Sequence, residues 1–536
     1  MSGYRDVTAP SDPRHARHSP KLNASTLHGF GRNALWTYGS MAVWTIAGLV
    51  VTGYAVRRLG ADHYAYYAMA SAITAAVVIA DVGLSMGVVR ATARQLAATE
   101  TEVREAQRRE IATAHATYVG IGAISAILAI AVAAALPWLL PVNAADLSSA
   151  RLTAFLVMAA AAVQLATSCL MGLPMGAQNY RITAVAMIAG AVLNLTTTIV
   201  GVPTLGVAAL GLGSVASIVV NRAILFVWCR RNARWFRLRP SKPSRGDVSK
   251  VGRFAGPLVL LAAGGQIINA TDLYVVGTVA TATAVGFYRV GMMLPSQASS
   301  LLYKGYDTAY PNLAAAGATD SERALRVLTR LGSLAGGVGF GVLLWRAPDF
   351  VRLLVGSRND LATEVFRLFA VTWMLNVTVH GVGLTLISRG RQRTYAQLGV
   401  AEIVANLGLT FGMAHLWGPA GAAIATLVIL GVFNTLVLPV WVRREFAISI
   451  RRVVLVDGLA TAVVGLAIAA AASLLASLTQ GAILHVAITT VAAFLVAISL
   501  APTFMGTDGR AALNIQGRRR LRPTPAEPQL GEVVRS

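Results

Sequence analysis

Seven of the ionisable side chains that fall inside long apolar stretches of the sequence, or close their ends, are selected as candidates. They are Arg57, Arg58, Asp81, Arg90, Asp272, Arg289 and His380. A charged group in apolar surroundings is costly, so such residues are candidates for binding or transport chemistry. Arginines can hold an anionic phosphate group, whereas an aspartate or a histidine can carry a proton. The sequence therefore predicts a polar site enclosed by apolar segments.

Residues in the first part of the chain also have structural explanations. Arg57 and Arg58 end an apolar run, where a long side chain can reach water or bond to a helix end. Asp81 and Arg90 lie nine residues apart in one run. A buried contact between helices accounts for Asp81 as well as a binding site does. The two explanations stay open for all four residues.

The second part of the chain shows a clearer interruption. Asp272 follows Gly264 and Gly265 in a polar, broken apolar run, and transporter helices interrupted by glycine often expose backbone groups to a binding site. Arg289 begins the next run, and an ion pair with Asp272 would lower the cost of both charges. His380 suits either a proton relay or a core histidine with satisfied hydrogen bonds.

The elements that hold these residues are predicted to be transmembrane helices. The chain has 536 residues, of which 55% are hydrophobic and 13% charged, with a mean hydropathy of +0.62. Separate apolar runs of about 20 residues are typical of a polytopic α-helical membrane protein. We expect an all-α fold of about 14 transmembrane helices. Its two cysteines form no metal-binding motif, and no metal site is expected.

The distribution of basic residues predicts the orientation. With both termini in the cytoplasm, 36 of the 46 basic residues lie on cytoplasmic segments, 7 lie on outer segments and 3 lie inside apolar runs. This asymmetry explains the net charge of +23 through membrane topology, so no nucleic-acid partner is expected. We expect a multi-pass protein of a bacterial cytoplasmic membrane with both termini inside.

A repeated stretch predicts two related halves. Residues 194–231 and 406–444 each contain an apolar run, a glycine-centred break, a second apolar run, a tryptophan and two arginines. The second copy lies 212 residues after the first at the initial asparagine (194 and 406) and at the glycine (206 and 418). At the tryptophan (228 and 441) the offset is 213, so one residue is inserted in the second copy. We expect two pseudo-symmetric six-helix lobes and a C-terminal helix pair. The predicted parts are a disordered cytoplasmic tail (1–32), the first lobe (33–231), a basic cytoplasmic linker (232–252), the second lobe (253–444), two further spans (445–503) and a disordered cytoplasmic tail (504–536).

Two sets of residues carry a resemblance to a known family. The first is Arg58-Leu59-Gly60, Tyr64, Tyr67, Asp81-Val82-Gly83-Leu84 and Arg90, and the second is Asp272, Val275, Gly277, Val285, Gly286 and Tyr288. In this pattern the chain resembles the polysaccharide transporters. These are the Wzx-type oligosaccharide flippases of the MOP superfamily (multidrug, oligosaccharidyl-lipid and polysaccharide exporters). Ala65 stands where the family usually has glycine.

The resemblance implies two lobes around a central cavity, with alternating access. It implies export of an oligosaccharide linked to polyprenyl pyrophosphate, a precursor of cell-surface polysaccharide. The expected partners are this lipid-linked oligosaccharide, membrane lipids, and a polysaccharide polymerase or glycosyltransferases. No cofactor is expected. Because the sequence lacks a Gly-Lys dipeptide it has no P-loop, so transport would draw on a proton or sodium gradient or on another external source.

Other functions remain open from the sequence. Within the superfamily these are a flippase for lipid II, the peptidoglycan precursor, and a MATE-type cation-coupled drug antiporter. A non-transporting scaffold for cell-wall assembly is a further alternative. An enzyme is not expected, because a polyprenyl-dependent glycosyltransferase or polymerase would need acidic residues on a larger outer loop than any predicted here.

Overall fold

The computed structural model describes residues 24–78, 80–139, 144–233, 235–236, 246, 268, 270–315, 318–389 and 391–504. Within these ranges the chain is helical and contains no β-strand, which confirms the predicted all-α class. The elements up to the central linker are α1 (Ala24–Leu59), α2 (Ala61–Val78), α3 (Ala80–Ala97), α4 (Thr101–Leu139), η2 (Ala144–Asp146), α5 (Leu147–Ala166), α6 (Cys169–Gly176), α7 (Tyr180–Leu205) and α8 (Ala208–Asn232). The later ones are a helical segment at 270–279, α10 (Ala282–Ala315), α11 (Ala318–Trp345), α12 (Ala347–Val355), α13 (Asp360–Ser388), α14 (Gln392–Thr426), η3 (Leu427–Phe433), α15 (Asn434–Trp441), η4 (Arg443–Glu445), α16 (Ile450–Arg452), η5 (Val453–Ala460), α17 (Thr461–Ala476) and α18 (Ala482–Phe504).

Ten of the described helices are long and apolar enough to cross a membrane. One of these, Thr394–Trp441, has 48 residues and consists of two helices, because the chain leaves helical geometry at Trp417 and Gly418. Helix formation follows from the apolar composition, since only a helix satisfies every backbone polar group within one segment in lipid. The protein is therefore a multi-pass membrane protein.

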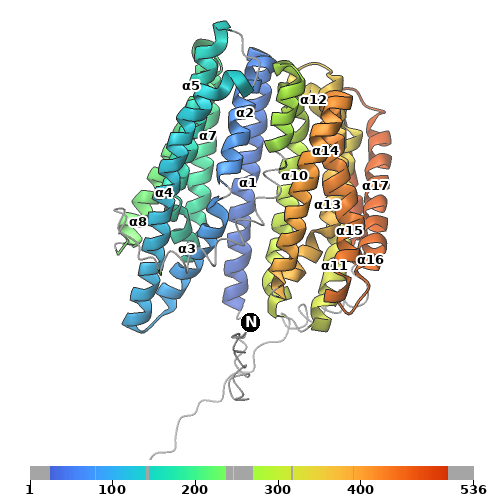
Figure 1. Ribbon diagram of the computed structural model, residues 1–536. Helices are drawn as coiled ribbons and strands as arrows, with labels where there is room; N and C mark the ends of the chain where they lie inside the picture. Colours follow the sequence, from blue (N-terminus) through green and yellow to red (C-terminus); the bar gives the residue numbers. More distant parts are fainter. Residues whose placement is uncertain are drawn as a thin grey trace, which may run out of the picture.

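The helices form two groups with α1 and α2 between them (Figure 1). Helices α3, α4, α5, α7 and α8 lie on one side, and the helices from α10 onward lie on the other. Residues 24–32, assigned to the first tail by the sequence analysis, belong to α1. Residues 1–23, most of the basic linker 232–252 and the tail 505–536 lie outside the described residues. The exact boundaries of the lobes stay a prediction.

The one-residue insertion in the second repeat copy has a structural counterpart. In the first copy the second apolar run forms the regular helix α8. In the second copy the matching run contains η3 (Leu427–Phe433), a π-helix, before it continues as α15. A π-helical turn accommodates an extra residue without breaking the helix. The insertion is therefore absorbed locally, and the flanking parts of the repeat keep their register.

The two lobes meet through a shared apolar core. Many of its buried side chains come from α1, α2, α10, α12 and α13, and they include Tyr64, Met69, Tyr288 and Phe369. Helix α2 packs on α10 and helix α1 packs on α12. The α2–α10 contact is close enough that a Cβ added at Gly286 would clash with the Ala61 carbonyl oxygen. The lobes are thus joined near the turn between α1 and α2.

The C-terminal helix pair is fixed to α11 by small residues. A Cβ added at Gly337 would clash with the Ala462 carbonyl oxygen, and one added at Gly465 would lie 2.8 Å from the Leu334 carbonyl oxygen. Helix pairs in membranes approach this closely where glycine and alanine face each other. The predicted pair of extra spans therefore packs on α11 of the second lobe.

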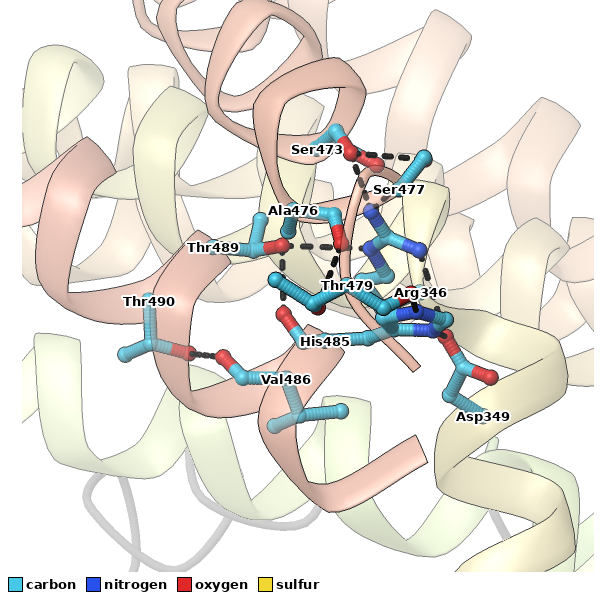
Figure 2. A network of polar contacts seen from close by, with 10 residues as sticks. All are labelled: Arg346, Asp349, Ser473, Ala476, Ser477, Thr479, His485, Val486, Thr489 and Thr490. Atoms are coloured by element: carbon cyan, nitrogen blue, oxygen red, sulfur yellow. Dashed lines mark hydrogen bonds and ion pairs between the residues drawn. The ribbon is translucent and has the colours of Figure 1, made fainter. Parts of the chain in front are cut away.

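Polar networks hold both ends of this pair. At one end the buried Asp457 of η5 accepts hydrogen bonds of 2.8 Å from the Nε atoms of Arg326 and Arg330 on α11. At the other end Arg346, between α11 and α12, donates to the Ser473 carbonyl oxygen and to Thr489 Oγ1 (Figure 2).

Candidate functional site

Asp272 lies at the centre of a buried polar cluster in the second lobe. Its Oδ2 accepts hydrogen bonds from Thr426 Oγ1 at 2.6 Å and from Tyr288 at 3.2 Å, and its Oδ1 accepts one from Thr410 Oγ1 at 3.4 Å. Asn406 hydrogen-bonds to both threonines, at 3.4 Å each. All five side chains are buried, and they come from segment 270–279, α10 and α14.

Hydrogen bonds alone stabilise the charge of Asp272 in the described part of the chain. No arginine, lysine or histidine described there forms an ion pair with it. Hydrogen bonds to a charged group are worth about 1.5–3 kcal/mol each, so three of them offset much of the cost of burying a carboxylate. The oxygens of Asp272, Asn406, Thr410 and Thr426 can hold a small cation, and the carboxyl can instead hold a proton. No group of three metal-ligating His, Cys, Asp or Glu side chains occurs among the described residues.

Arg289 does not form the ion pair with Asp272 that the sequence analysis considered. Its guanidinium instead interacts, electrostatically and through a hydrogen bond, with the hydroxyl of the fully buried Tyr64, which comes from α2 of the other lobe. The same hydroxyl lies 3.2 Å from Thr52 Oγ1 on α1. Arg289 therefore belongs to the contact between the lobes.

Arg57 joins the two lobes directly. Its Nε donates to the Leu354 carbonyl oxygen at 3.1 Å, and its Nη2 donates to the Leu353 carbonyl oxygen. These carbonyls end α12, where Gly356 adopts a left-handed conformation with φ +91°. The last carbonyls of a helix have no partner within the helix and carry partial negative charge, so a guanidinium binds them well. Arg58 is exposed and lies over the Tyr54 ring, 5.9 Å from its centroid.

Arg90 and Asp81 take part in contacts within the first lobe. Arg90 on α3 forms an ion pair of 2.8 Å with Glu110 on α4. The carboxylate of Asp81 accepts a hydrogen bond of 2.6 Å from Tyr118. The structure therefore links α3 to α4 through both residues, and their predicted role in substrate binding stays a prediction.

A buried arginine in the first lobe was not among the predicted site residues. Arg222 on α8 donates through Nη2 to the Gln164 carbonyl oxygen at 3.4 Å, and its Nε and Nη1 have no hydrogen-bond partner in the described structure. Asp81 attracts it electrostatically without a direct ion pair. Its place inside a predicted span was the signal that could have identified it.

His380 belongs to an aromatic and amide cluster in the second lobe. Its ring stacks on Tyr303 with centroids 4.0 Å apart, and the Tyr303 hydroxyl donates to Asn376 Oδ1. Nearby, Glu402 of α14 accepts a hydrogen bond from Asn434. The sequence analysis did not select Glu402, although it is a carboxylate within a predicted span.

Comparisons with known proteins bear on the family and the fold. The sequence family described as "Polysaccharide biosynthesis protein" matches residues 30–315, more than half of the chain. The chain belongs to this family. A comparison with curated protein sequences finds no match.

The fold is that of solved MOP-superfamily structures. An inward-facing multidrug resistance MATE transporter matches with a TM-score of 0.61 at 17% identity, over 75% of this chain and 94% of its own. The lipid II flippase MurJ in an inward closed conformation also gives 0.61, at 11% identity, over 90% of this chain and 99% of its own. A MOP-superfamily transporter from Pyrococcus furiosus gives 0.57 at 17% identity, over 78% and 95%. This polysaccharide biosynthesis protein therefore has the fold of membrane transporters and flippases.

Proposed function

We propose that this protein exports an oligosaccharide linked to polyprenyl pyrophosphate across a bacterial cytoplasmic membrane by alternating access, and that both of its termini lie in the cytoplasm. The lipid-linked oligosaccharide and the surrounding lipids are its main partners, and a polymerase or glycosyltransferases act before or after it. The protein itself catalyses no covalent step in this proposal.

The combination of family and fold carries the proposal. The family belongs to polysaccharide biosynthesis, and the fold is shared with transporters. A protein with both properties fits the transfer of a polysaccharide precursor between leaflets better than it fits drug efflux.

The contacts between the lobes support alternating access. The bonds from Arg57 to the end of α12 lie near the turn between α1 and α2, at the end that the basic-residue distribution assigns to the outer face. Hydrogen bonds of this kind form and break without unfolding either lobe. Opening this end while closing the other would expose a bound substrate to the outside.

The Asp272 cluster is the proposed coupling site. A proton or a sodium ion bound there neutralises a buried carboxylate, and this change in charge alters how α10 and α14 pack around it. A gradient of that ion then biases the lobes toward one orientation.

The test is a depletion experiment in the cell that carries the gene. The expected result is accumulation of polyprenyl-linked oligosaccharide on the cytoplasmic leaflet, reversed by the wild-type protein. Accumulation of lipid II instead would favour the peptidoglycan function, which the match to MurJ over 90% of this chain makes the second candidate. A fall in drug efflux with an unchanged lipid-linked pool would support an antiporter. No change in any of them would point to a scaffold.

A further inference from the structure

We propose that Glu402 and Asn434 form a second proton-binding site in the second lobe, apart from Asp272, and that the transport cycle loads and unloads this proton. The use of the proton in transport rests on the function proposed above. The existence of the site rests on the contacts of the two side chains alone.

The amide of Asn434 is only half satisfied in the structure. Its Nδ2 donates a hydrogen bond to Glu402 Oε1, whereas its Oδ1 is buried and has no hydrogen-bond partner among the described residues. The residue itself is 6% exposed. A buried acceptor without a donor is unfavourable, so a missing hydrogen atom is expected beside it.

A proton on Glu402 supplies that hydrogen atom. A carboxylic acid facing a primary amide can form two hydrogen bonds in a ring, one from the amide N–H and one from the acid O–H. An ionised carboxylate can form only the first. If the Asn434 amide is turned over, its Oδ1 faces Glu402 directly, and this contact again needs a proton on the carboxyl. In the first orientation the acid form adds the second hydrogen bond, and in the turned-over orientation it is required for any hydrogen bond between the two groups.

Glu402 is not held in its ionised form by any ion pair that the described residues make. The titratable groups that act on it are the hydroxyls of Tyr395, from its own helix, and Tyr303, from α10. His380 of α13 stacks on the far side of Tyr303. A neutral acid fits these neighbours better than a carboxylate does.

The internal repeat contains a corresponding pair of positions in the first lobe. At offsets of 212 and 213, Glu402 and Asn434 correspond to Gly190 and Asn221 in the first lobe. A Cβ added at Gly190 would lie 3.7 Å from the Asn221 Cβ, so these two positions are also neighbours there. Only the second lobe places a carboxyl group beside the asparagine.

The π-helix and the spacing along α14 connect this pair to the Asp272 cluster. Asn434 directly follows the π-helix η3, whose Leu430 carbonyl oxygen accepts a hydrogen bond of 3.0 Å from Asn376. Glu402, Asn406 and Thr410 stand four residues apart, so they share one face of α14. Loading of a proton at Glu402 therefore changes the helix face that also contacts Asp272.

Infrared difference spectroscopy of the full-length protein in lipid nanodiscs tests the site without any transported lipid. Spectra are compared between about pH 5 and about pH 9, where an exposed carboxyl is ionised over most of the range. A carbonyl stretch of a protonated carboxyl should persist at neutral pH in the wild type. Its intensity should fall in Glu402→Gln by the contribution of one carboxyl, leaving any band of Asp272; the band should be shifted in Glu402→Asp and unchanged in Glu105→Gln, which alters an exposed carboxyl. Spectra of Glu402→Gln identical to the wild type at every pH would overturn the assignment.

The role in transport needs a second readout. Glu402→Gln keeps the shape of the protonated acid, so we expect an unchanged unfolding temperature together with at least a tenfold loss of gradient-driven transport. Wild-type transport by a variant that lacks the Glu402 contribution to the infrared band would overturn the role in the cycle. If the protein carries no lipid-linked oligosaccharide at all, the infrared result still stands, so the two proposals fail separately.

Discussion

Gly206 and Gly418, which lie 212 residues apart, adopt nearly the same unusual backbone conformation. Gly206 has φ +57° and ψ −138°, and Gly418 has φ +62° and ψ −150°. Side chains rarely allow this combination of angles, so glycine is required at both turns. The two hairpins of the repeat therefore share their turn geometry as well as their sequence pattern.

Replacing either glycine by alanine should destabilise the protein by about 1–3 kcal/mol, because alanine must adopt a strained conformation there. Space is not the cause, since nothing lies within 4 Å of a Cβ added at Gly206 or Gly418. Thermal unfolding in detergent measures the effect. Gly412→Ala is the matched control, because its Cβ also meets open space in a helix with ordinary angles. Equal unfolding temperatures for the three variants would contradict this explanation.

The outer contact of Arg57 predicts a shift in conformation. Arg57→Ala removes two hydrogen bonds from a charged donor to the end of α12. The conformation with a closed outer end should therefore be destabilised relative to the open one by about 1–2 kcal/mol, which lowers the ratio of their populations roughly tenfold. Spin labels at Leu205 and Arg358, both exposed, would report the distance between the lobes there. Arg58→Ala serves as the control, since Arg58 contacts the Tyr54 ring within its own helix. Identical distance distributions in both variants would show that the hydrogen bonds of Arg57 do not hold the outer end closed.

The link between Asp457 and α11 predicts a loss of stability. Changing Arg326 and Arg330 together to alanine leaves a buried carboxylate without its partners, which should cost on the order of 2 kcal/mol. Adding Asp457→Asn should recover part of that loss, because a neutral amide is cheaper to bury unpaired. Unfolding temperatures of the double and triple variants make the comparison. A triple variant less stable than the double would contradict this electrostatic account.

A histidine at the outer end of the first lobe predicts a pH dependence. Burial lowers the pKa of His63, but the Asp62 and Asp146 carboxylates, each 3.3 Å away, raise it by more, so its pKa lies above the ordinary value of 6.5. The stabilisation from the protonated ring is fully present below that ordinary value and is lost as pH rises through the raised pKa. His63→Gln should therefore lower the unfolding temperature at pH near 6 and have little effect near pH 9. A constant difference across this range would show that His63 acts through packing alone.

The sequence predicted the all-α membrane fold because apolar runs and basic loops follow directly from the bilayer. It also predicted the repeat and its one-residue insertion, but not the π-helix that absorbs the insertion. Asp272 could be selected because it interrupts an apolar run. Its partners Thr410 and Thr426 could not, since hydroxyl groups are common in membrane helices and only tertiary packing brings these two to the carboxylate.

The partners of the arginines could not be predicted from the sequence. The backbone acceptors of Arg57 belong to α12, about 300 residues away, and carry no side-chain signal. An ion pair of Arg289 with Asp272 was one possibility from the sequence, but Arg289 interacts with Tyr64 of the other lobe. Arg222 and Glu402 were visible as charges inside spans. What distinguished them was the unsatisfied hydrogen-bonding atoms around them, which only coordinates reveal.

Reconstituted transport tests the central claim most directly. Purified protein in proteoliposomes would be supplied with a polyprenyl-pyrophosphate-linked oligosaccharide on one leaflet, and its arrival on the other would be detected by a glycosidase that cannot enter. We expect transfer that depends on an imposed proton or sodium gradient and falls at least tenfold in Asp272→Asn, a variant of almost the same size. Transfer at the rate of protein-free liposomes, with a folded protein and either gradient, would contradict the assignment of this chain as a flippase.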